Sequence, residues 1–596
     1  MPDASHVHRL LDQVRRGRLP RRDFITRMVS AGLAAPMASM LLMNAGLAQT
    51  SGALPAYKPT RRGGGGPLRV LLWQGPTLLN PHFGIGVKDN EGSAIFYENL
   101  AQWDDDGNLV PVLAAEIPSR ANGGVAADGK SVTWKLKKGV SWHDGAPFTA
   151  DDVIFNWQFA TDVATASTRA GAYLNLKLEK LDSHTVRVVF AKPQPFWAGS
   201  YAAIYLIPKH LFASSMGAKS RDSPYNLKPV GTGPYRFVDF KPGDLVRGEI
   251  NPNYHLPNRP HFDSIELKGG GDAVSAARAV LQTGEYDYAW NLLVEDDVLK
   301  RMERSGKGRV VVAGGGTVEF IQLAYADPAI EVEGERASAK SRHPTLRDPA
   351  VRAAMALLVD RQSIQDFVFG RGGPATTNIL ANPARFRSPN NKADYSIDKA
   401  NAVLDAAGWE RGAGGVREKD GRRLQFVYQS SINSARQKTQ TLIKQACAKA
   451  GIELELKAVQ ASVFFSSDVG NPDTVARFQA DMQQFAFSMG QPDPGRYMDQ
   501  YVSWEFATKA NKWQGRNTSR WRNDEYDRLY KAAETELDPV QRAAMFIRMN
   551  DLVVQDHHIL PLVFRPKIAG IGSKLVMPLS GWSEDMGLLA HWYREA

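Results

Sequence analysis

The residues of this 596-residue chain that could do catalytic chemistry are few and scattered. No G-x-S-x-G, H-E-x-x-H or paired-cysteine motif occurs, so nucleophilic and zinc sites lack a local signature. Cys447, the single cysteine, stands in the helical stretch KQACAKAG, where a lone thiol typically packs in a core. His557 and His558 form the one adjacent histidine pair and precede an apolar strand, so we expect them to be structural. The sequence predicts no enzyme, no metal site and no cofactor, with an exported hydrolase as the rival class.

Length and composition predict a folded protein of two or three compact units. Hydrophobic residues make up 43% and charged residues 23%, which are ordinary values for globular chains. One cysteine excludes a disulfide framework. The formal charge of +10 falls to +6 without residues 1–48, which hold seven Arg and three Asp. Basic and acidic residues alternate along the rest, which argues against nucleic acid as a partner.

The elements that would position a site begin after an export segment. Arg21 and Arg22, with Phe24 two residues on, precede a stretch without charge from Met28 to Tyr57. This arrangement resembles a twin-arginine signal peptide, here residues 1–48, with cleavage after Ala48. A retained amphipathic anchor is the alternative. Because no cysteine stands at the cleavage point, we expect a soluble protein of the periplasm rather than a lipoprotein.

The remainder alternates strand and helix patterns, which predicts an α/β fold. Residues 49–65 lack periodicity, end in glycines and are expected to form a flexible lead-in. Val132, Trp134 and Leu136 alternate with polar residues as in a half-buried strand. Three helix starts carry caps, and Gly231 and Gly233 are expected to supply unusual backbone angles. The expected caps are Thr149, Asp348 and Ser396.

Several of these blocks, in this order, resemble the family 5 extracellular solute-binding proteins, the dipeptide-, oligopeptide- and nickel-binding receptors of ABC importers. The resemblance covers nearly the whole chain beyond the signal. Its matching stretches are LLNPHF, YENLAQWDDDGNLVPVLAAE, GVSWHDGAPFTADDVIF, PVGTGPYRF, NPNYHLPNRPHFDSIEL, VLQTGEYDYA, LRDPAVRAAMALLVDRQSI, KANAVLDAAGW and QPDPGRYM.

The resemblance implies a type II (cluster C) periplasmic-binding-protein fold, with two hinged lobes and an additional inserted domain. It divides the chain into domain I (66–94, 229–316 and 548–596), domain II (95–228) and domain III (317–547). It further implies a monomer that captures a small solute by hinge closure. Its partners would be an inner-membrane permease and ATPase, besides the twin-arginine translocase during export.

The resemblance also marks a departure at the ligand site. Peptide-binding members hold the peptide ammonium with an Asp whose position here is Gly490. Asp493, three residues on, could bind ligand or could only start a turn before Pro494, and its replacement by Ala is expected to leave folding intact. Phe487 keeps an apolar wall. A peptide or peptide-like solute is the expected ligand, with an opine, another modified amino acid, or a nickel or haem complex as alternatives.

Other candidate ligand-binding residues follow from their place in loops that line family clefts. For the tryptophans, a core position is the competing interpretation. Arg496 could pair with a ligand carboxylate, although surface arginines are common. These candidates are Trp73, Gln74, Thr77, Trp290, Asn291, Arg496 and Trp504.

Overall fold

The computed structural model describes residues 4–31, 38, 41–42, 56–84, 86–199, 201–465 and 470–595. The chain forms two units. Unit 1 comprises residues 1–314, 537–540 and 567–596, and unit 2 comprises residues 315–536 and 541–566. Among the helices of the described ranges, none combines the length and the apolar character needed to cross a bilayer.

Unit 1 is built on a sheet in which β20, β10, β1, β9, β8 and β7 follow one another. β1 pairs in parallel with both β9 and β10, and its residues are alternately exposed and buried, as the sequence pattern predicts. The strands are β1 Pro67–Leu72, β2 Ala101–Trp103, β3 Leu109–Pro111, β4 Ser131–Lys135, β5 Leu176–Asp182, β6 Thr185–Phe190, β7 Tyr235–Lys241, β8 Leu245–Ile250, β9 Ser264–Gly269, β10 Tyr288–Ala289, β21 Leu575–Val576 and β22 Tyr593–Arg594.

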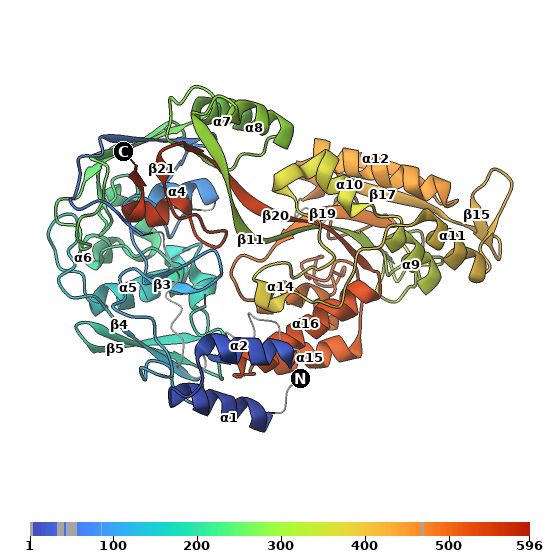
Figure 1. Ribbon diagram of the computed structural model, residues 1–596, viewed down its shortest axis with the longest axis horizontal. Coiled ribbons are helices and arrows are strands. Elements are labelled where there is room, and N and C mark those ends of the chain that lie inside the picture. The colour runs from blue at the N-terminus through green and yellow to red at the C-terminus, as the bar shows by residue number, and fades with distance from the viewer. Residues whose placement is uncertain are drawn as a thin grey trace. The chain divides into compact units, whose positions relative to one another are not determined.

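Helices α7 and α8 lie side by side in unit 1 and share an apolar core with β10 (Figure 1). Asp272 caps α7, since its carboxylate accepts hydrogen bonds from the amides of Val274 and Ser275. The helices of unit 1 are α1 Ala4–Arg15, α2 Arg21–Ser30, α4 Val87–Ala94, α5 Ala150–Thr161, α6 Lys209–Phe212, α7 Ala273–Leu281 and α8 Asp296–Glu303.

The stretch predicted as a half-buried strand is β4, and its neighbour α5 begins at the predicted cap. Val132 and Trp134 are fully buried, which confirms the alternation. The Thr149 side chain accepts a hydrogen bond from the Asp151 amide, and the Asp152 carboxylate accepts one from the Thr149 amide. This reciprocal capping box explains the sharp start of α5.

Gly231 and Gly233 are glycines for a reason other than the predicted one. Neither has a positive φ. A Cβ atom would instead lie 1.8 Å from the Phe96 carbonyl oxygen at Gly231 and 2.5 Å from it at Gly233. The expectation of unusual backbone angles is therefore wrong, and close backbone approach excludes a side chain at both positions.

The predicted signal peptide is described only in part. Arg21 and Arg22 open α2, and Phe24 on the same helix is fully buried. Ala48 and residues 49–55 lie outside the described residues. Residues 56–65 are bound to unit 1, because the Arg62 guanidinium donates to the carbonyls of Tyr254 and Arg259, each at 2.6 Å. This part of the predicted lead-in is thus anchored rather than loose.

Unit 2 contains the strand order β18, β17, β19 and β11. β17 runs parallel to both β18 and β19, whereas β11 is antiparallel to β19. The strands confined to unit 2 are β12 Glu331–Val332, β13 Glu335–Arg336, β14 Glu410–Arg411, β15 Arg417–Lys419, β16 Arg422–Arg423, β17 Gln425–Ser431, β18 Glu453–Val459 and β19 Met482–Ser488.

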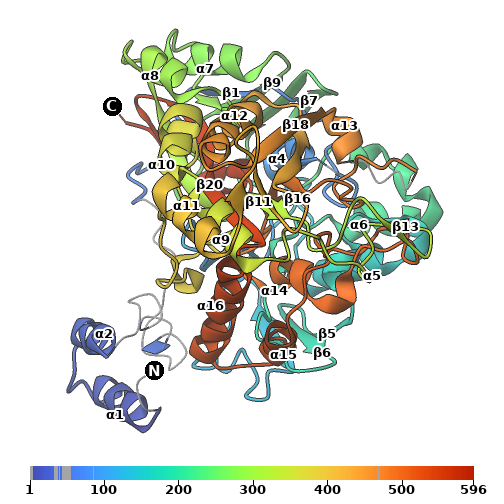
Figure 2. The ribbon, with the colours of Figure 1, turned by 90° about the vertical axis from the view of Figure 1, so that its right-hand side faces the viewer.

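The helices of unit 2 bury one large apolar core against this sheet. Two pairs, α9 with α11 and α15 with α16, lie together in both views (Figures 1 and 2). Asp348 and Ser396 cap α9 and α11 as predicted, and Cys447 is buried in that core. The helices are α9 Pro349–Leu357, α10 Arg361–Ile364, α11 Ile397–Ala406, α12 Ser434–Lys449, α13 Ala461–Phe464, α14 Gly495–Met498, α15 Asp524–Ala533 and α16 Pro539–Gln555.

Two strands pass from one unit to the other. β11 Gly308–Leu323 crosses at residues 314 and 315, next to the predicted boundary at 316. β20 Ile559–Gly572 crosses at residues 566 and 567, whereas the predicted return at 548 falls within α16. The first two residues of α16, Pro539 and Val540, are also assigned to unit 1, and the boundary at 548 stays a prediction. The further division of unit 1 into domains I and II stays a prediction.

Buried histidines make the stability of the protein sensitive to acid. Burial lowers the pKa of His82 from 6.5 to about 4, although its ring is hydrogen-bonded to Asn156. The unfolded chain therefore takes up a proton at this site below pH 6.5, and the folded chain only near pH 4. Stability must fall as the pH falls through this window, by about 2 kcal/mol between pH 7 and pH 5.

We expect the variant His82→Gln to remove that part of the pH dependence, in denaturant unfolding at pH 7 and pH 5. The matched control is His210→Gln, whose ring is exposed beside Asp144. Equal losses of stability on acidification in both variants and the parent chain would contradict the assignment.

Candidate functional site

In unit 1, two predicted site residues meet at the ends of neighbouring parallel strands. Trp73 follows β1 and Trp290 follows β10, so both stand at the same edge of the sheet. Their ring centroids are 5.9 Å apart, with the planes tilted by 36°. Trp290 is 6% exposed and belongs to the core, whereas Trp73 is half-buried and partly accessible to solvent.

Asn291 fixes the geometry of this pair. Its carbonyl accepts a hydrogen bond of 3.0 Å from Trp73 Nε1 and one of 2.8 Å from the Leu293 amide. Its φ is +53°, in the left-handed region that Asn and Gly tolerate best. Asn291 thus positions Trp73 through its backbone.

We expect Asn291→Ala to destabilise unit 1 by about 1 kcal/mol, because Ala is strained at this φ. Asn291→Gly should cost much less, since Gly adopts the conformation freely. Denaturant unfolding followed by tryptophan fluorescence measures both variants. Equal effects of the two replacements would show that the backbone angle is unimportant.

Gln74 and Thr77 follow Trp73 in the same loop, and both are exposed. The Thr77 hydroxyl donates to Asp89 at 3.1 Å and accepts a hydrogen bond of 2.8 Å from Lys88 Nζ. Thr77 is therefore tied to the start of α4. Gln74 shows no side-chain restraint of this kind in the described part of the chain and stays a candidate by position.

In unit 2, the carboxyl ends of β17 and β19 define one edge of the sheet, which we call the carboxyl edge of unit 2. Phe487 lies near the end of β19, and Gly490 follows it. Gly490 is exposed, and no atom lies within 4 Å of the place where its Cβ would stand. The antiparallel strand β11 brings Thr317 opposite Ser488, with their hydroxyls 2.8 Å apart.

Phe487 is part of an aromatic and charged cluster at this edge. Its ring centroid is 5.7 Å from that of Tyr497, and the Arg516 guanidinium carbon lies 5.4 Å from its ring centroid. Arg516 is also ion-paired with Asp499. Burial raises the pKa of Asp499 to about 6, although the cation opposes this shift. These contacts cover one face of the Phe487 ring and hold it at the carboxyl edge of unit 2.

The Asp493 carboxylate is bonded to other groups of the protein. It is 8% exposed, forms a two-pronged ion pair with Arg542, and accepts a hydrogen bond of 2.9 Å from the Gly495 amide. A carboxylate saturated in this way is a poor ligand group. The expectation that its removal leaves folding intact conflicts with this buried pairing, because Arg542 would lose its counter-charge.

The last two candidates are looser. Arg496 is exposed, and its carbonyl accepts a hydrogen bond of 2.9 Å from the Arg516 guanidinium. Trp504 is 47% exposed, lies edge-on to Tyr530, and has Lys531 Nζ 4.7 Å from its ring centroid. Neither is held as firmly as Phe487.

A buried cluster of charged side chains lies at the same edge and was not predicted from the sequence. Glu319 of β11 is fully buried and bonds to Arg436 of α12 at 2.7 Å and to Arg565 of β20 at 3.4 Å. Glu319 lies opposite Ala486 of β19, two residues from the end of that strand. The three charges come from segments more than 100 residues apart, so spacing in the sequence offered no signal.

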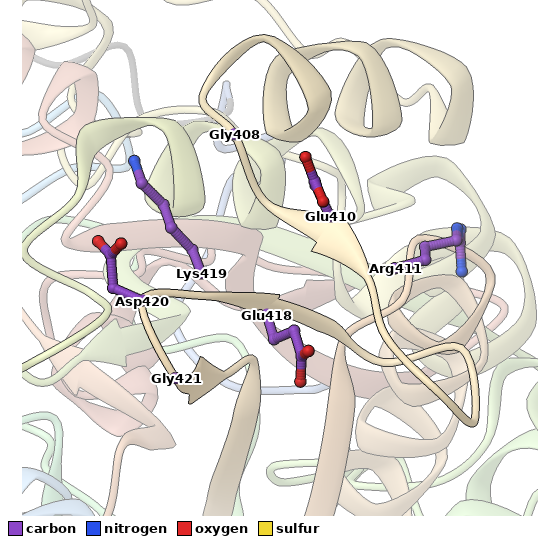
Figure 3. A pocket seen from close by; sticks show the side chains of 7 residues that line it. All are labelled: Gly408, Glu410, Arg411, Glu418, Lys419, Asp420 and Gly421. Atoms are coloured by element: carbon purple, nitrogen blue, oxygen red, sulfur yellow. The ribbon is translucent and has the colours of Figure 1, made fainter.

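A hollow elsewhere on unit 2 is less suited to a ligand. The Arg411 and Lys419 side chains donate hydrogen bonds to the backbone carbonyls of Lys449 and Ala407, each at 2.7 Å. Both cationic groups therefore already have partners within the protein. Lys449 ends α12, so this hollow is at the other end of that helix from Arg436. Its lining residues are Gly408, Glu410, Arg411, Glu418, Lys419, Asp420 and Gly421 (Figure 3).

No group of three or more His, Cys, Asp or Glu side chains suited to a metal ion occurs among the described residues. The described residues form two α/β units with two connecting strands, and aromatic side chains lie at the carboxyl ends of parallel strands. These are features of the class of two-lobed solute-binding proteins.

The chain belongs to the family described as bacterial extracellular solute-binding proteins, family 5, whose middle-region model matches residues 108–508. Proteins of this family are the solute-binding components of ABC importers, as the sequence predicted. They are binding proteins rather than enzymes.

Individual relatives are distant but cover most of the chain. It is 26% identical over 501 residues to the oligopeptide-binding protein AppA of Bacillus subtilis, covering 83% of this chain and 85% of that protein. It is 24% identical over 518 residues to the glutathione-binding protein GsiB of Escherichia coli K12, covering 86% and 92%.

Solved structures agree in fold. The substrate-binding protein CtaP of Listeria monocytogenes gives a TM-score of 0.72 at 21% identity, covering 89% of this chain and 99% of that one. AppA of Bacillus subtilis in complex with a nonapeptide gives 0.64 at 23% identity, covering 90% and 100%. The predicted type II periplasmic-binding-protein fold is confirmed.

Proposed function

We propose that the chain is the periplasmic receptor of an ABC importer for a peptide or peptide-like solute. The observation that carries this proposal is the placement of aromatic side chains at the carboxyl ends of parallel strands in each unit, Trp73 with Trp290 in unit 1 and Phe487 in unit 2. Such strand ends are where open α/β sheets bind ligands. The peptide in the related AppA structure supports the ligand class.

We propose that capture occurs by hinge closure, with the permease and its ATPase recognising the loaded form. Support comes from β20, where the side chains two residues apart are bonded within different units. Arg565 contacts Glu319 in unit 2, and Lys567 Nζ lies 2.8 Å from Asp585 in unit 1. We infer that bending occurs around Pro566 of β20 and at the three glycines 314–316 of β11, where the chain passes between the units.

Ligand binding supplies the free energy that favours the closed state over the open state. A ligand shifts the open and closed populations only by its difference in affinity for the two states. Moving the ratio from 1:99 to 99:1 takes about 5.5 kcal/mol. Contacts made only in the closed state must provide this difference.

A second candidate ligand class is a solute without a free ammonium, such as an opine or another modified amino acid. Gly490 favours it, because the side chain that would carry the amine-binding carboxylate is absent and Asp493 is paired with Arg542. The same reasoning makes binding through a carboxylate more plausible than binding through an amine.

Arg21 and Arg22 are exposed at the start of α2 and are therefore accessible to a translocase. We infer that the twin-arginine system recognises them and that residues 1–48 are removed. We also infer that the exported chain works as a monomer and has no hydrolase activity.

Mass spectrometry of ligand released from natively purified protein tests the function directly. A peptide or modified amino acid is expected. X-ray scattering with and without that ligand should then show a smaller radius of gyration in the loaded state. Recovery of a metal complex, or turnover of the ligand, would overturn the proposal.

A further inference from the structure

The carboxyl edge of unit 2 carries more positive than negative charge at one point. Glu319 is shared by two guanidinium groups, those of Arg436 and Arg565. In the described ranges, Glu319 is the only carboxylate within ion-pairing distance of either arginine. One positive charge is therefore left without a counter-charge beside a fully buried group.

The two arginines are held very differently. Arg436 donates to both Glu319 oxygens, at 2.7 and 3.3 Å, and to Ser431 Oγ at 2.6 Å. Its side chain is 11% exposed. Arg565 has a single contact at 3.4 Å, and its side chain is 31% exposed. Arg436 therefore neutralises Glu319, and Arg565 keeps most of its five donors for another partner.

Glu319 itself has little capacity left for Arg565. Gln484 also donates to Glu319 Oε1 at 3.2 Å, and Gln484 is in turn fixed by the Tyr428 hydroxyl at 2.7 Å. Oε1 accepts hydrogen bonds from Arg436 Nε and Gln484, and Oε2 accepts from Arg436 at 3.3 Å and from Arg565 at 3.4 Å. The acceptor positions of the carboxylate are thus in use, and Arg565 has only a long, shared contact.

The surroundings of Arg565 suit an anion. α12 begins at Ser434, directly after β17, so its positive end lies at the same edge as Arg436. The hydroxyls of Thr317 and Ser488 are exposed between Glu319 and the end of the strands. An unpaired guanidinium is tolerated while it is hydrated, but excluding water around it requires a counter-charge.

We propose that Arg565, backed by Arg436, binds a carboxylate of the ligand at the carboxyl edge of unit 2. This inference rests on the proposed function and narrows its ligand class. The receptor would select solutes by a carboxylate, either a terminal one or that of an acidic side chain. It would not require a free amine, which agrees with the missing side chain at Gly490.

The test uses pools of randomised tetrapeptides incubated with the full exported chain, with bound members identified by mass spectrometry. One pool has free termini, one is N-acetylated and one is C-amidated. We expect the first two to bind alike and the amidated pool about tenfold to a hundredfold more weakly. Survival of only Asp- or Glu-containing members in the amidated pool would assign the site to side-chain carboxylates.

Arg565→Gln should remove the difference between the free and amidated pools, whereas Arg565→Lys should keep part of it. Arg548→Gln is the matched control, because that arginine is on unit 2, exposed and paired with Glu525. Thermal unfolding checks that each variant is folded. Retention of the difference in Arg565→Gln, or no difference in the parent chain, overturns the inference. Binding of no pool at all overturns the inference and removes peptides from the proposed ligand class, whereas the receptor function itself is overturned only by the mass spectrometry of released ligand.

Discussion

Replacing Gly490 by Asp is expected to raise affinity for peptides with a free amino terminus by about tenfold to a hundredfold. The family resemblance implies that this position holds the peptide ammonium in peptide-binding relatives. The new side chain has room, because no atom lies within 4 Å of the Cβ position and the residue lacks a positive φ. An ammonium that loses water on closure gains most from a carboxylate beside it.

Isothermal titration with defined tetrapeptides measures this gain. Gly490→Asn is the matched control, since it adds a side chain of the same size without charge. N-acetylated versions of the same peptides should bind the Gly490→Asp variant no more tightly than they bind the parent chain. A gain that is the same for acetylated and free peptides would mean that the effect is steric and that the ammonium is held elsewhere.

Local sequence patterns correctly predicted three helix starts and one half-buried strand. Thr149, Asp348 and Ser396 all cap helices as predicted, because a side-chain oxygen just before a helix can accept a hydrogen bond from an amide that has no partner within the helix. The alternation of Val132 and Trp134 with polar residues likewise defined a half-buried strand. Such features depend on neighbours in the sequence only.

Features that depend on distant segments were missed or misread. The glycines at 231 and 233 are required by the carbonyl of Phe96, which lies far earlier in the chain, and no local pattern reveals this contact. The cluster of Glu319, Arg436 and Arg565 exists only once three elements have assembled.

The candidate site shows the same division. Trp73 and Trp290 were each predicted to lie in a loop that follows a strand, and the parallel pairing of those strands brings their ring centroids to 5.9 Å. Asp493 was a candidate because it lies three residues after the position of the family's amine-binding carboxylate, but the sequence does not tell whether a carboxylate faces solvent or a buried partner. Arg542, which decides the matter, belongs to α16 and lies 49 residues further along the chain.

Asp493→Ala is expected to destabilise unit 2 by about 3 to 5 kcal/mol. The side chains of the pair are 9% and 11% exposed, so the mutation leaves the Arg542 guanidinium charged and largely out of water. Arg542 is further fixed by a hydrogen bond of 2.9 Å from its Nε to the Ala533 carbonyl, which hinders its escape to solvent. Loss of the acceptor for the Gly495 amide adds to the cost.

Denaturant unfolding of the single variants and of the double variant Asp493→Ala with Arg542→Met measures the coupling. The double variant should be less destabilised than the sum of its parts, because no charge is left buried without a partner. Asp394→Ala is the control, since its pair with Lys399 is 50% and 64% exposed and should contribute less than about 1 kcal/mol. If Asp493→Ala instead unfolds like the parent chain and only weakens ligand binding, the carboxylate serves the ligand and its pairing with Arg542 is incidental.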